Sequence, residues 1–378
     1  MKRLLIIGAG EMQVPIIKKA KQLGHYCIVS DINPEAPGFN FADKSVISST
    51  FDKEKTLECA IANKIDGVLT TSDYPVRTVA YICEKLNLKG ISTYSAKICT
   101  DKYKQRQAML GYNFYNPKHF LISTDDDLTQ IINNLEYPLI VKPIDSSASR
   151  GVTKVANKEE LLNAINYAKQ YSLHQKVIIE EFIDGLEYSV ECITQDRNIH
   201  IIAITQKDTK GANNKYFVEN KHIVPANISY NLENKIHKYV KQIIKIFKID
   251  NSAIHAEIKI SSKGIVLIEL GARLGGDFIT SDLIPLATGI DMLENAIRIA
   301  LNEQVNITQT KSLYAGIKFV NTENYNNARD HITKNTDSIF KYELKPYKNV
   351  SLTNSLDRLG FIISCCENRK DLEKILNF

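Results

Sequence analysis

The chain has 378 residues, of which 44% are hydrophobic and 24% charged, and its 48 lysine and arginine residues exceed its 43 aspartate and glutamate residues by five. This composition is typical of a soluble globular protein and excludes a disordered, collagen-like or low-complexity chain. At roughly 100 to 200 residues per domain, the length predicts two or three domains. The small positive charge is spread along the chain, so we expect no nucleic-acid partner.

The amino terminus and the cysteines indicate the compartment. The apolar run after Arg3 is too short for a secretory signal, and no segment reaches the roughly 18 apolar residues of a membrane span. We therefore expect a cytoplasmic protein with no membrane partner. The seven cysteines show no C-x-x-C spacing and lie mostly in apolar stretches, which favours reduced, buried thiols over a redox or zinc role.

The first hundred residues alternate β-rich runs with stretches of helical periodicity. Strands are predicted at residues 4–7, 26–30 and 67–71, and helices at residues 14–23, 53–63 and 76–86. Such alternation is typical of βαβ units and predicts a parallel sheet. We interpret residues 1–100 as a Rossmann-like α/β domain.

The pattern changes after residue 101. Helices are predicted through residue 110, near residues 125–134, through residue 168, and at residues 231–247 and 292–301. Strand-like runs lie at residues 120–123, 139–142, 152–155, 177–182, 188–194 and 199–206. The runs at residues 253–260 and 265–270 predict a hairpin with Gly264 in its turn. Strands at residues 314–320 and 361–366 and helices at residues 324–334 and 371–376 predict a small α+β domain at residues 307–378.

A glycine-rich turn follows the first predicted strand and precedes the first predicted helix. Its sequence is Gly8-Ala9-Gly10-Glu11-Met12-Gln13, and Asp31 ends the second strand, which is the context of a dinucleotide-binding fingerprint. Gln13 stands where that fingerprint has its third glycine. We therefore favour a Rossmann-like start whose loop serves another ligand, or a tight turn, over NAD binding.

A second loop of small residues, Ser146-Ser147-Ala148-Ser149-Arg150-Gly151, follows the strand that ends at Lys142. Small residues let backbone N–H groups approach phosphate oxygens, hydroxyl groups add donors, and the lysine adds a point charge. The segment therefore suits a phosphate loop. A flexible surface hairpin is the alternative.

Two glutamates on the predicted hairpin give the strongest chemical signal. With a three-residue turn at residues 262–264, Glu257 lies opposite Glu269, and both side chains leave one face of the hairpin about 5 Å apart. Two carboxylates placed there repel each other unless a cation lies between them, and oxygen ligands favour Mg²⁺ over zinc. The alternative is an exposed hairpin face on which Lys259 forms a salt bridge.

The segment after Glu269 is rich in glycine and carries one arginine, Arg273. An arginine four residues beyond a metal-binding glutamate can reach an anion that the metal holds. Metal and guanidinium together neutralise charge on a transferred phosphoryl group, so the arrangement indicates phosphoryl-transfer chemistry. The chain lacks the motifs of P-loop ATPases, of protein kinases and of H-E-x-x-H metalloproteases.

In their order and spacing, these parts resemble the ATP-grasp superfamily over nearly the whole chain. The resemblance places residues 101–306 in a two-lobed ATP-grasp domain, between the Rossmann-like start and the small α+β tail. It implies ATP and Mg²⁺ as cofactors, with Mn²⁺ as an alternative metal, and small-molecule carboxylate and amine substrates. Dimers are common in this superfamily, so the resemblance is also compatible with a homodimer.

The resemblance further implies a role for each matching residue. Glu257 and Glu269 match magnesium ligands, and Arg273 and Lys142 match the groups that act on the transferred phosphoryl group. The positions that match ATP-binding residues are Lys102, Lys142, Ser146, Ser147, Ser149, Gly151, Glu180, Glu181, Phe182, Ile183 and Glu187. The positions that match substrate-binding residues are Glu219, His222, Arg273, Gly275 and Gly276.

Each of these assignments has a simpler alternative. Lys102 lies at a very polar helix start, where a lysine is commonly solvated, and Glu180 and Glu181 could be an exposed strand end. Residues 207–226, which contain Glu219 and His222, resemble the loop by which amino-acid ligases hold the polar end of an amino acid, and a surface loop is the alternative there.

Two positions depart from the family pattern. Gly271 stands where many members have asparagine, so one metal ligand is lost or supplied by water, although amino-acid ligases tolerate this. Ala148 occupies a loop position that is often glycine, which could stiffen the loop. Neither departure removes a metal carboxylate or a phosphate lysine. His222 is a candidate general base by its position alone.

Among the subgroups, the chain resembles most the carboxylate–amine ligases, which include L-amino-acid ligases and carbamoyl-phosphate-synthase-like proteins. This implies a ligase that activates a carboxylate as an acyl phosphate and forms an amide with an amine, releasing ADP and phosphate. The alternatives are a bicarbonate-activating carboxylase of the biotin-carboxylase or purine-biosynthesis type, and a non-catalytic nucleotide-binding regulator. Tyr74, Asp277 and residues 207–226 are candidates for shaping the substrate pocket.

Overall fold

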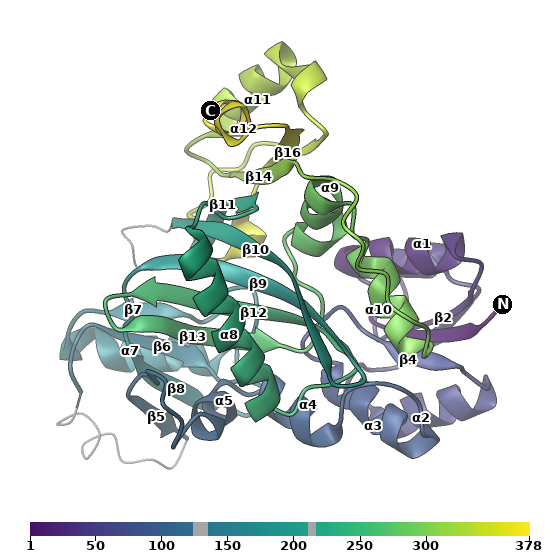
Figure 1. Ribbon diagram of the computed structural model, residues 1–378. Helices are drawn as coiled ribbons and strands as arrows, with labels where there is room; N and C mark the ends of the chain where they lie inside the picture. The colour runs from purple at the N-terminus through teal and green to yellow at the C-terminus, as the bar shows by residue number, and fades with distance from the viewer. Residues whose placement is uncertain (124–134, 211–216) are drawn as a thin grey trace.

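The computed structural model describes residues 1–123, 135–210 and 217–378, and of Lys210 only the backbone. The helix predicted near residues 125–134 and residues 211–216 of the predicted substrate loop lie outside the described residues. Figure 1 shows three parts: an amino-terminal unit, a central pair of sheets, and the carboxyl-terminal segment at the top of the view.

The amino-terminal unit is a four-stranded parallel sheet with strand order β3-β2-β1-β4. Its strands are β1 (Arg3–Ile7), β2 (Tyr26–Asp31), β3 (Lys44–Ile47) and β4 (Gly67–Leu69). Its helices are α1 (Val14–Gln22), α2 (Lys53–Ala62), α3 (Val76–Leu86) and α4 (Thr93–Cys99). The parallel Rossmann-like sheet is confirmed. Strand β3 was not predicted, because this edge strand is largely exposed and carries no apolar alternation.

A small antiparallel sheet follows, with strand order β5-β8-β6-β7. Its strands are β5 (His119–Ile122), β6 (Leu139–Pro143), β7 (Thr153–Val155) and β8 (Val177–Glu181). Helix α5 (Lys102–Ala108) precedes this sheet in the chain, and α7 (Lys158–Lys169) packs on it and buries Leu161 and Ile165. These elements match the expected ones within a few residues.

The largest sheet is antiparallel, with strand order β13-β12-β9-β10-β11-β14-β16-β15. Its first strands are β9 (Leu186–Gln195), β10 (Asn198–Lys210), β11 (Val218–Val224), β12 (Ser252–Ser261) and β13 (Gly264–Gly271). The remaining strands are β14 (Tyr314–Val320), β15 (Lys341–Leu344) and β16 (Gly360–Cys366). Most of the described part of residues 207–226 is therefore strand, which corrects the expected loop. The pairing of β11 with β14 makes the tail strands a continuation of this sheet.

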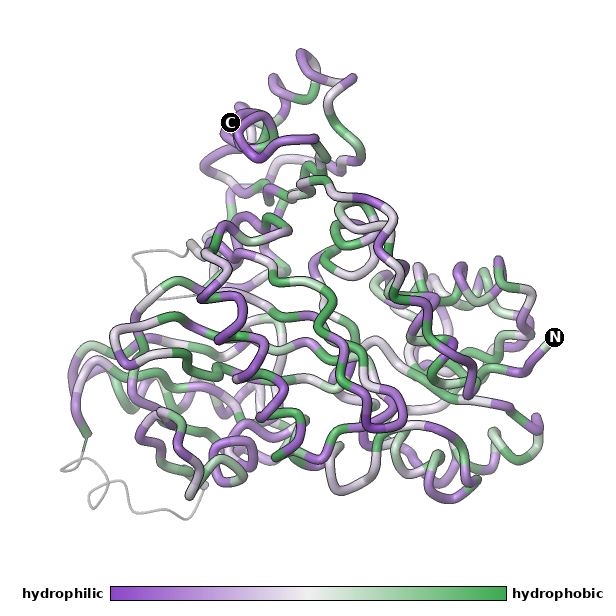
Figure 2. The backbone as a smooth tube through the Cα atoms, viewed as in Figure 1, coloured by the Kyte–Doolittle hydropathy of each residue, from purple (hydrophilic) through white to green (hydrophobic). Residues whose placement is uncertain are grey.

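The helices of this part are α8 (Tyr230–Ile246), α9 (Ile284–Thr288), α10 (Met292–Ala300), α11 (Tyr325–Lys334) and α12 (Arg369–Leu376). Helix α8 begins at Ser229, whose side chain accepts a hydrogen bond from the N–H of Leu232, and buries a face that includes Ile236 and Ile243. Hydrophobic residues (green) and hydrophilic residues (purple) alternate along α8 in Figure 2, as expected for a helix with one face on a sheet and the other in solvent.

Helix α10 joins the amino-terminal unit to the large sheet. It packs against α1, β4 and β12, and one continuous core contains Ile17 of α1, Ile297 of α10 and Ile317 of β14. At the contact with β4, a Cβ added to Gly67 would lie 2.3 Å from the carbonyl oxygen of Ala300, so only glycine allows this approach. The three parts are thus packed as one body.

The seven cysteines are free, and Cys27, Cys83, Cys99 and Cys192 are buried, where burial raises the pKa of each thiol. Within residues 1–123, 135–210 and 217–378, no helix combines the length and the apolar character needed to cross a membrane.

Candidate active site

A large cavity lies between the small sheet and the large sheet, with a volume of about 1260 Å³. The amino-terminal unit and the tail also line it, through residues such as Tyr74 and Arg358. The predicted site residues that line it are Lys102, Lys142, Ser146, Ser147, Ser149, Glu180, Glu181, Phe182, Ile183, Glu187, Glu219, His222, Glu257, Glu269, Arg273, Gly275 and Gly276. Of the predicted set, only Gly151 is not among the lining residues.

The paired glutamates lie opposite each other on β12 and β13, as their spacing predicts. The path to this register differs from the expected one. Ser261 pairs with Gly264, so the turn has two residues rather than three. A β-bulge between the pairs of Ile258 and Glu257 then shifts the register by one residue, so that Glu257 still pairs with Glu269. The bulge therefore places both carboxylates at the cavity.

Each carboxylate of the pair has its own cation. Lys207 lies 2.6 Å from Glu257, and Lys102 lies 2.9 Å from Glu269, each measured from Nζ to a carboxylate oxygen. His255 donates to Glu257 at 3.2 Å through Nε2. Burial acts to raise the pKa of Glu257, but Lys207 and His255 hold that pKa well below its usual range. Glu257 therefore keeps its negative charge although it is largely buried.

Lys207 is surrounded by carboxylates. Besides Glu257, its ammonium lies 3.2 Å from Glu187 and 3.6 Å from Glu219, and only 3% of its side chain is exposed. Burial would lower its pKa, but the three glutamates raise the pKa of Lys207 well above its usual value. Glu187, expected to bind ATP, and Glu219, expected to bind the substrate, therefore share one cation with the predicted metal ligand Glu257.

His255 connects the carboxylate pair to a fully buried acid. Its Nδ1 lies 2.6 Å from Glu191 of β9, and its Nε2 faces Glu257. Burial would lower the pKa of His255, but Glu191 and then Glu257 raise it to about 9. Gly275 packs directly against this pair, because a Cβ there would lie 2.7 Å from an oxygen of Glu191. At Gly276, by contrast, an added Cβ would meet no atom within 4 Å.

Lys142 belongs to a second buried charge cluster. Its Nζ lies 2.7 Å from one oxygen of Glu180, and Nε of Arg106 lies 2.7 Å from the other. Burial alone would raise the pKa of Glu180, but Arg106 and Lys142 lower it to about 2. Glu180 is therefore not an exposed strand end, and its carboxylate is engaged by these two cations.

Residues 180–183, the hinge between β8 and β9, are contacted by side chains from several parts of the chain. Glu181 accepts a hydrogen bond from the hydroxyl of Tyr115 and pairs with Lys263. The carbonyl of Ile183 accepts from Lys259 at 3.2 Å, so Lys259 does not pair with the glutamates of its own hairpin. The ammonium of Lys154 lies 4.0 Å from the ring centre of Phe182. The strand and its exit thus form one wall of the cavity.

The predicted phosphate loop turns back towards the amino-terminal unit. Lys102 donates to the carbonyl of Ser146 at 2.6 Å, and the guanidinium of Arg150 donates to the hydroxyl of Tyr74 at 2.8 Å. Ser146 is 93% buried, and its hydroxyl has no hydrogen-bond partner among the described residues. Ala148 has φ of +57°, a left-handed backbone conformation that glycine adopts more readily than alanine.

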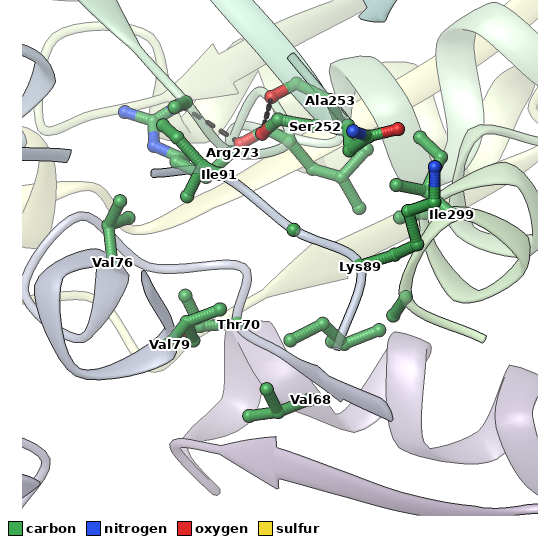
Figure 3. Close-up of a pocket in the computed structure, with 17 residues that line it drawn as sticks. Val68, Thr70, Val76, Val79, Lys89, Ile91, Ser252, Ala253, Arg273 and Ile299 are labelled. Carbon is green, nitrogen blue, oxygen red and sulfur yellow. Dashed lines mark hydrogen bonds between the residues drawn. The ribbon is translucent and has the colours of Figure 1, made fainter. Parts of the chain in front are cut away.

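Arg273 forms a bidentate ion pair with Asp73, which lies between β4 and α3 of the amino-terminal unit. The distances are 2.9 Å from Nε to Oδ1 and 3.0 Å from NH2 to Oδ2. Burial would lower the pKa of the guanidinium, but Asp73 raises it. Figure 3 shows Arg273 and Ile91 among the residues that line a separate cavity of about 50 Å³.

The tail completes the end of the cavity that holds Glu219 and His222. Arg358 donates to both oxygens of Asp277 at 2.8 and 3.0 Å, and to Glu219 at 2.8 Å. His222 is fully buried, and its Nε2 lies 3.4 Å from Asp277. Its Nδ1 has no partner within the described part of the chain. Arg358 therefore fixes the two acidic residues at this wall.

The amino-terminal glycine turn also faces the cavity, through Glu11, Met12 and Gln13. Asp31 accepts from the N–H of Ala9 at 2.8 Å, so its carboxylate holds the turn rather than reaching for a ribose. Gln13 fills the turn and donates to hydroxyls of the segment that follows β4. Gln13 therefore occupies the space that a third glycine would leave open.

Several charged residues of the site were not predicted: Asp73, Arg106, Glu191, Lys207, His255 and Arg358. Lys207 lay inside the segment singled out for substrate binding, directly after the run predicted as a strand at residues 199–206. Asp73 and Arg358 lie far from the hairpin in sequence, and no local spacing connects them with it. Only the fold brings them to the cavity.

The donor set at the hairpin suits a magnesium ion that is held together with phosphates. The described residues contain no group of three histidine, cysteine, aspartate or glutamate side chains arranged to hold a metal alone. Mg²⁺ bound with a nucleotide commonly uses one or two carboxylates plus phosphate oxygens. Glu257 and Glu269, opposite each other in register, provide that number of carboxylates.

Comparison with known proteins agrees with this geometry. Residues 135–282 match the family model described as an ATP-grasp domain. The chain therefore contains an ATP-grasp domain, and this domain carries Lys142, Glu180, both hairpin glutamates and Arg273.

Three relatives illustrate the likeness. Alanine–anticapsin ligase of Bacillus subtilis is 28% identical over 247 residues, which are 59% of this chain and 51% of the relative, so the chain spans about half the length of that protein. L-amino acid ligase from Bacillus licheniformis superposes with a TM-score of 0.81 at 20% identity, covering 100% of this chain and 96% of that one. N5-carboxyaminoimidazole synthetase from Staphylococcus aureus complexed with ADP gives 0.78 at 15% identity, covering 99% and 95%. The two structures show the fold.

The Glu180 cluster makes acid stability testable. The pKa of Glu180 lies near 2, below its ordinary value of 4.5, so its ion pairs stabilise the fold above pH 4.5 and that contribution is lost as the pH falls towards 2. A shift of this size corresponds to about 3 kcal/mol. We expect Glu180→Gln to lose less free energy of unfolding than the wild type between pH 5 and pH 3, as measured by urea unfolding.

The exposed Glu58 provides the control, because Glu58→Gln removes one carboxylate without a buried partner and should keep the acid dependence of the wild type. Parallel acid dependence of Glu180→Gln and the wild type would show that the cluster does not hold Glu180 in its charged form.

Proposed function

We propose that the chain is an ATP-dependent carboxylate–amine ligase that forms an amide or peptide bond, with an amino acid among its substrates. The observation that carries the proposal is the opposition of Glu257 and Glu269 across the hairpin, in a cavity that also holds Lys102, Lys142 and Arg273. Such a set suits a polyphosphate with its metal. The ATP-grasp domain and the ligase relatives support the same reaction class.

In the first step, an oxygen of the substrate carboxylate bonds to the γ-phosphorus of ATP as the bond to the bridging oxygen of ADP breaks. Arg273 and Lys142 offset charge on the transferred group and orient it. Glu257 and Glu269 would hold Mg²⁺, which supplies further positive charge at the phosphates. The ATP-binding roles of the phosphate loop and of the hinge at residues 180–183 belong to this proposal.

In the second step, the nitrogen of the amine substrate attacks the acyl carbon, and phosphate leaves. The attacking nitrogen gives up a proton, and we propose His222 as the acceptor, because one of its ring nitrogens lies near Asp277 and the other has no described partner. Glu219 lies on the same strand and suits a positively charged amino group. The products are an amide, ADP and phosphate.

Water must be kept from the acyl phosphate, which it would hydrolyse. The loop at residues 146–151 is the part of the cavity wall suited to this, because Arg150 spans from it to Tyr74 of the amino-terminal unit. We propose that the loop closes over the bound nucleotide. The domain boundaries at residues 100 and 306, a homodimer and a cytoplasmic location stay predictions.

A carboxylating ligase that activates bicarbonate is the second candidate, because the fold of N5-carboxyaminoimidazole synthetase matches nearly the whole chain. ADP release by the purified protein should separate the two. We expect release with ATP, Mg²⁺ and one or more single amino acids or amino-acid pairs, and mass spectrometry should then identify an amide.

Release that depends on bicarbonate, with no response to any amino acid, would instead establish the carboxylating ligase. Nucleotide binding by calorimetry without release in any mixture would favour a non-catalytic regulator. Both results contradict the proposed ligase.

Removing one carboxylate of the pair tests the metal assignment. We expect Glu269→Gln to lower kcat for ADP release by at least about 100-fold, because even residues that only support a metal ligand cost 10- to 100-fold when changed. The protein should stay folded, as judged by its circular dichroism spectrum.

Glu233→Gln, on the exposed side of α8, removes the same charge far from the cavity and is the matched control. It should keep the activity of the wild type. Soluble, folded Glu269→Gln with near-normal kcat would refute the metal role, and loss of folded protein would identify Glu269 as a structural carboxylate.

A further inference from the structure

The ion pair between Asp73 and Arg273 crosses from the amino-terminal unit to the exit of the metal hairpin. Both carboxylate oxygens are used, at 2.9 and 3.0 Å, and a third bond runs from NH1 of Arg273 to the carbonyl of Leu274 at 3.0 Å. A guanidinium has five N–H donors, so two remain for an anion in the cavity. The plane of the guanidinium is fixed by these three bonds.

Gly271 lies directly beneath this ion pair. A Cβ added there would lie 3.0 Å from Oδ1 of Asp73 and 3.4 Å from Nε of Arg273. The backbone of Gly271 pairs with His255 at the end of β13, so this end of the strand is held in the sheet. A side chain at position 271 would therefore push on the ion pair rather than move away from it.

The space above Gly271 is the space that a side chain at this position would need. The carboxylate of Asp73 occupies that space, although Asp73 lies about 200 residues away in the sequence. The glycine and the aspartate thus depend on each other: the glycine leaves room, and the aspartate fills it and holds the arginine.

We propose that Asp73 is a positioning residue for Arg273 and that Asp73 and Gly271 form one functional unit, in which a carboxylate of the amino-terminal unit takes the space of a side chain at position 271. The inference rests on the proposed function of Arg273 as the group that contacts the transferred phosphoryl group. It adds that the orientation of Arg273 is set from outside the ATP-grasp domain.

A purely structural tie would behave differently. If the ion pair served only to hold the amino-terminal unit in place, its loss would lower stability and leave the chemistry of the remaining folded protein unchanged. The ion pair of Lys19 with Asp291, at 2.7 Å between α1 and α10, is such a contact far from the hairpin. Asp291→Asn is therefore the matched control, since asparagine also caps a helix well.

The test is a double-mutant cycle on the full-length protein with Asp73→Ala, Gly271→Ala and the double variant. We expect Gly271→Ala to lower kcat for ADP release at least tenfold in the wild type and by less than about twofold in the Asp73→Ala background, with the KM for ATP unchanged throughout. Asp73→Asn, which offers only one carbonyl oxygen, should also lower kcat about tenfold or more while the protein stays folded. Asp291→Asn should keep the kcat of the wild type.

Equal effects of Gly271→Ala in the two backgrounds would overturn the coupling, and a normal kcat in Asp73→Asn would overturn the positioning role.

A second measurement, of phosphate binding, separates this inference from the proposed function. In the absence of turnover, calorimetric binding of inorganic phosphate to the complex with MgADP reports on the anion contact of Arg273 separately from the chemical step. Asp73→Asn and Gly271→Ala should each weaken phosphate binding about tenfold. The double variant Asp73→Ala/Gly271→Ala should bind phosphate as weakly as Asp73→Ala does. Unchanged phosphate affinity in Asp73→Asn and in Gly271→Ala would contradict the inference.

Discussion

The repulsion between two carboxylates held opposite each other on neighbouring strands is the constraint around which the cavity is organised. Glu257 and Glu269 are in register on β12 and β13, and an unpaired buried carboxylate is costly. The fold meets that cost with Lys207 and Lys102, which come from β10 and α5. These lysines offset the repulsion between the two carboxylates, and they surround the place that we propose for a metal with its polyphosphate.

The same principle extends outward from the hairpin. Glu180 has Lys142 and Arg106, Asp73 has Arg273, and Asp277 has Arg358, so these acidic residues of the cavity wall each have an opposite charge beside them. Several of these pairs join different parts of the chain. The amino-terminal unit and the tail therefore contribute charged side chains to the site. A charged ligand that enters the cavity must compete with ion pairs that already exist there.

Much of the fold and part of the site could be predicted from sequence, for physical reasons. The parallel sheet follows from apolar periodicity, and the facing of Glu257 and Glu269 follows from strand alternation and a short turn. The turn itself was expected to have three residues, whereas it has two, and the bulge that compensates has no sequence signal of its own. The sequence pattern thus predicted the correct pairing of Glu257 with Glu269, although the predicted turn was one residue too long.

What could not be predicted depends on contacts between distant segments. No local pattern connects Asp73 with Arg273 or Arg358 with Glu219, because these contacts exist only after three parts of the chain have packed. The strand β11 was mistaken for part of a loop because a polar segment precedes it and its partner β14 lies about 90 residues away. Sequence therefore indicated the chemistry of the hairpin, while its supporting charges required the structure.

The formation of an acyl phosphate is the central claim of this account, and isotope transfer tests it most directly. An oxygen of the substrate carboxylate bonds to phosphorus in the first step and leaves with phosphate in the second. With a substrate whose carboxylate is labelled with oxygen-18, the account predicts that one labelled oxygen appears in the released phosphate, as read by mass spectrometry. Release of ADP and amide with no label in the phosphate would contradict it.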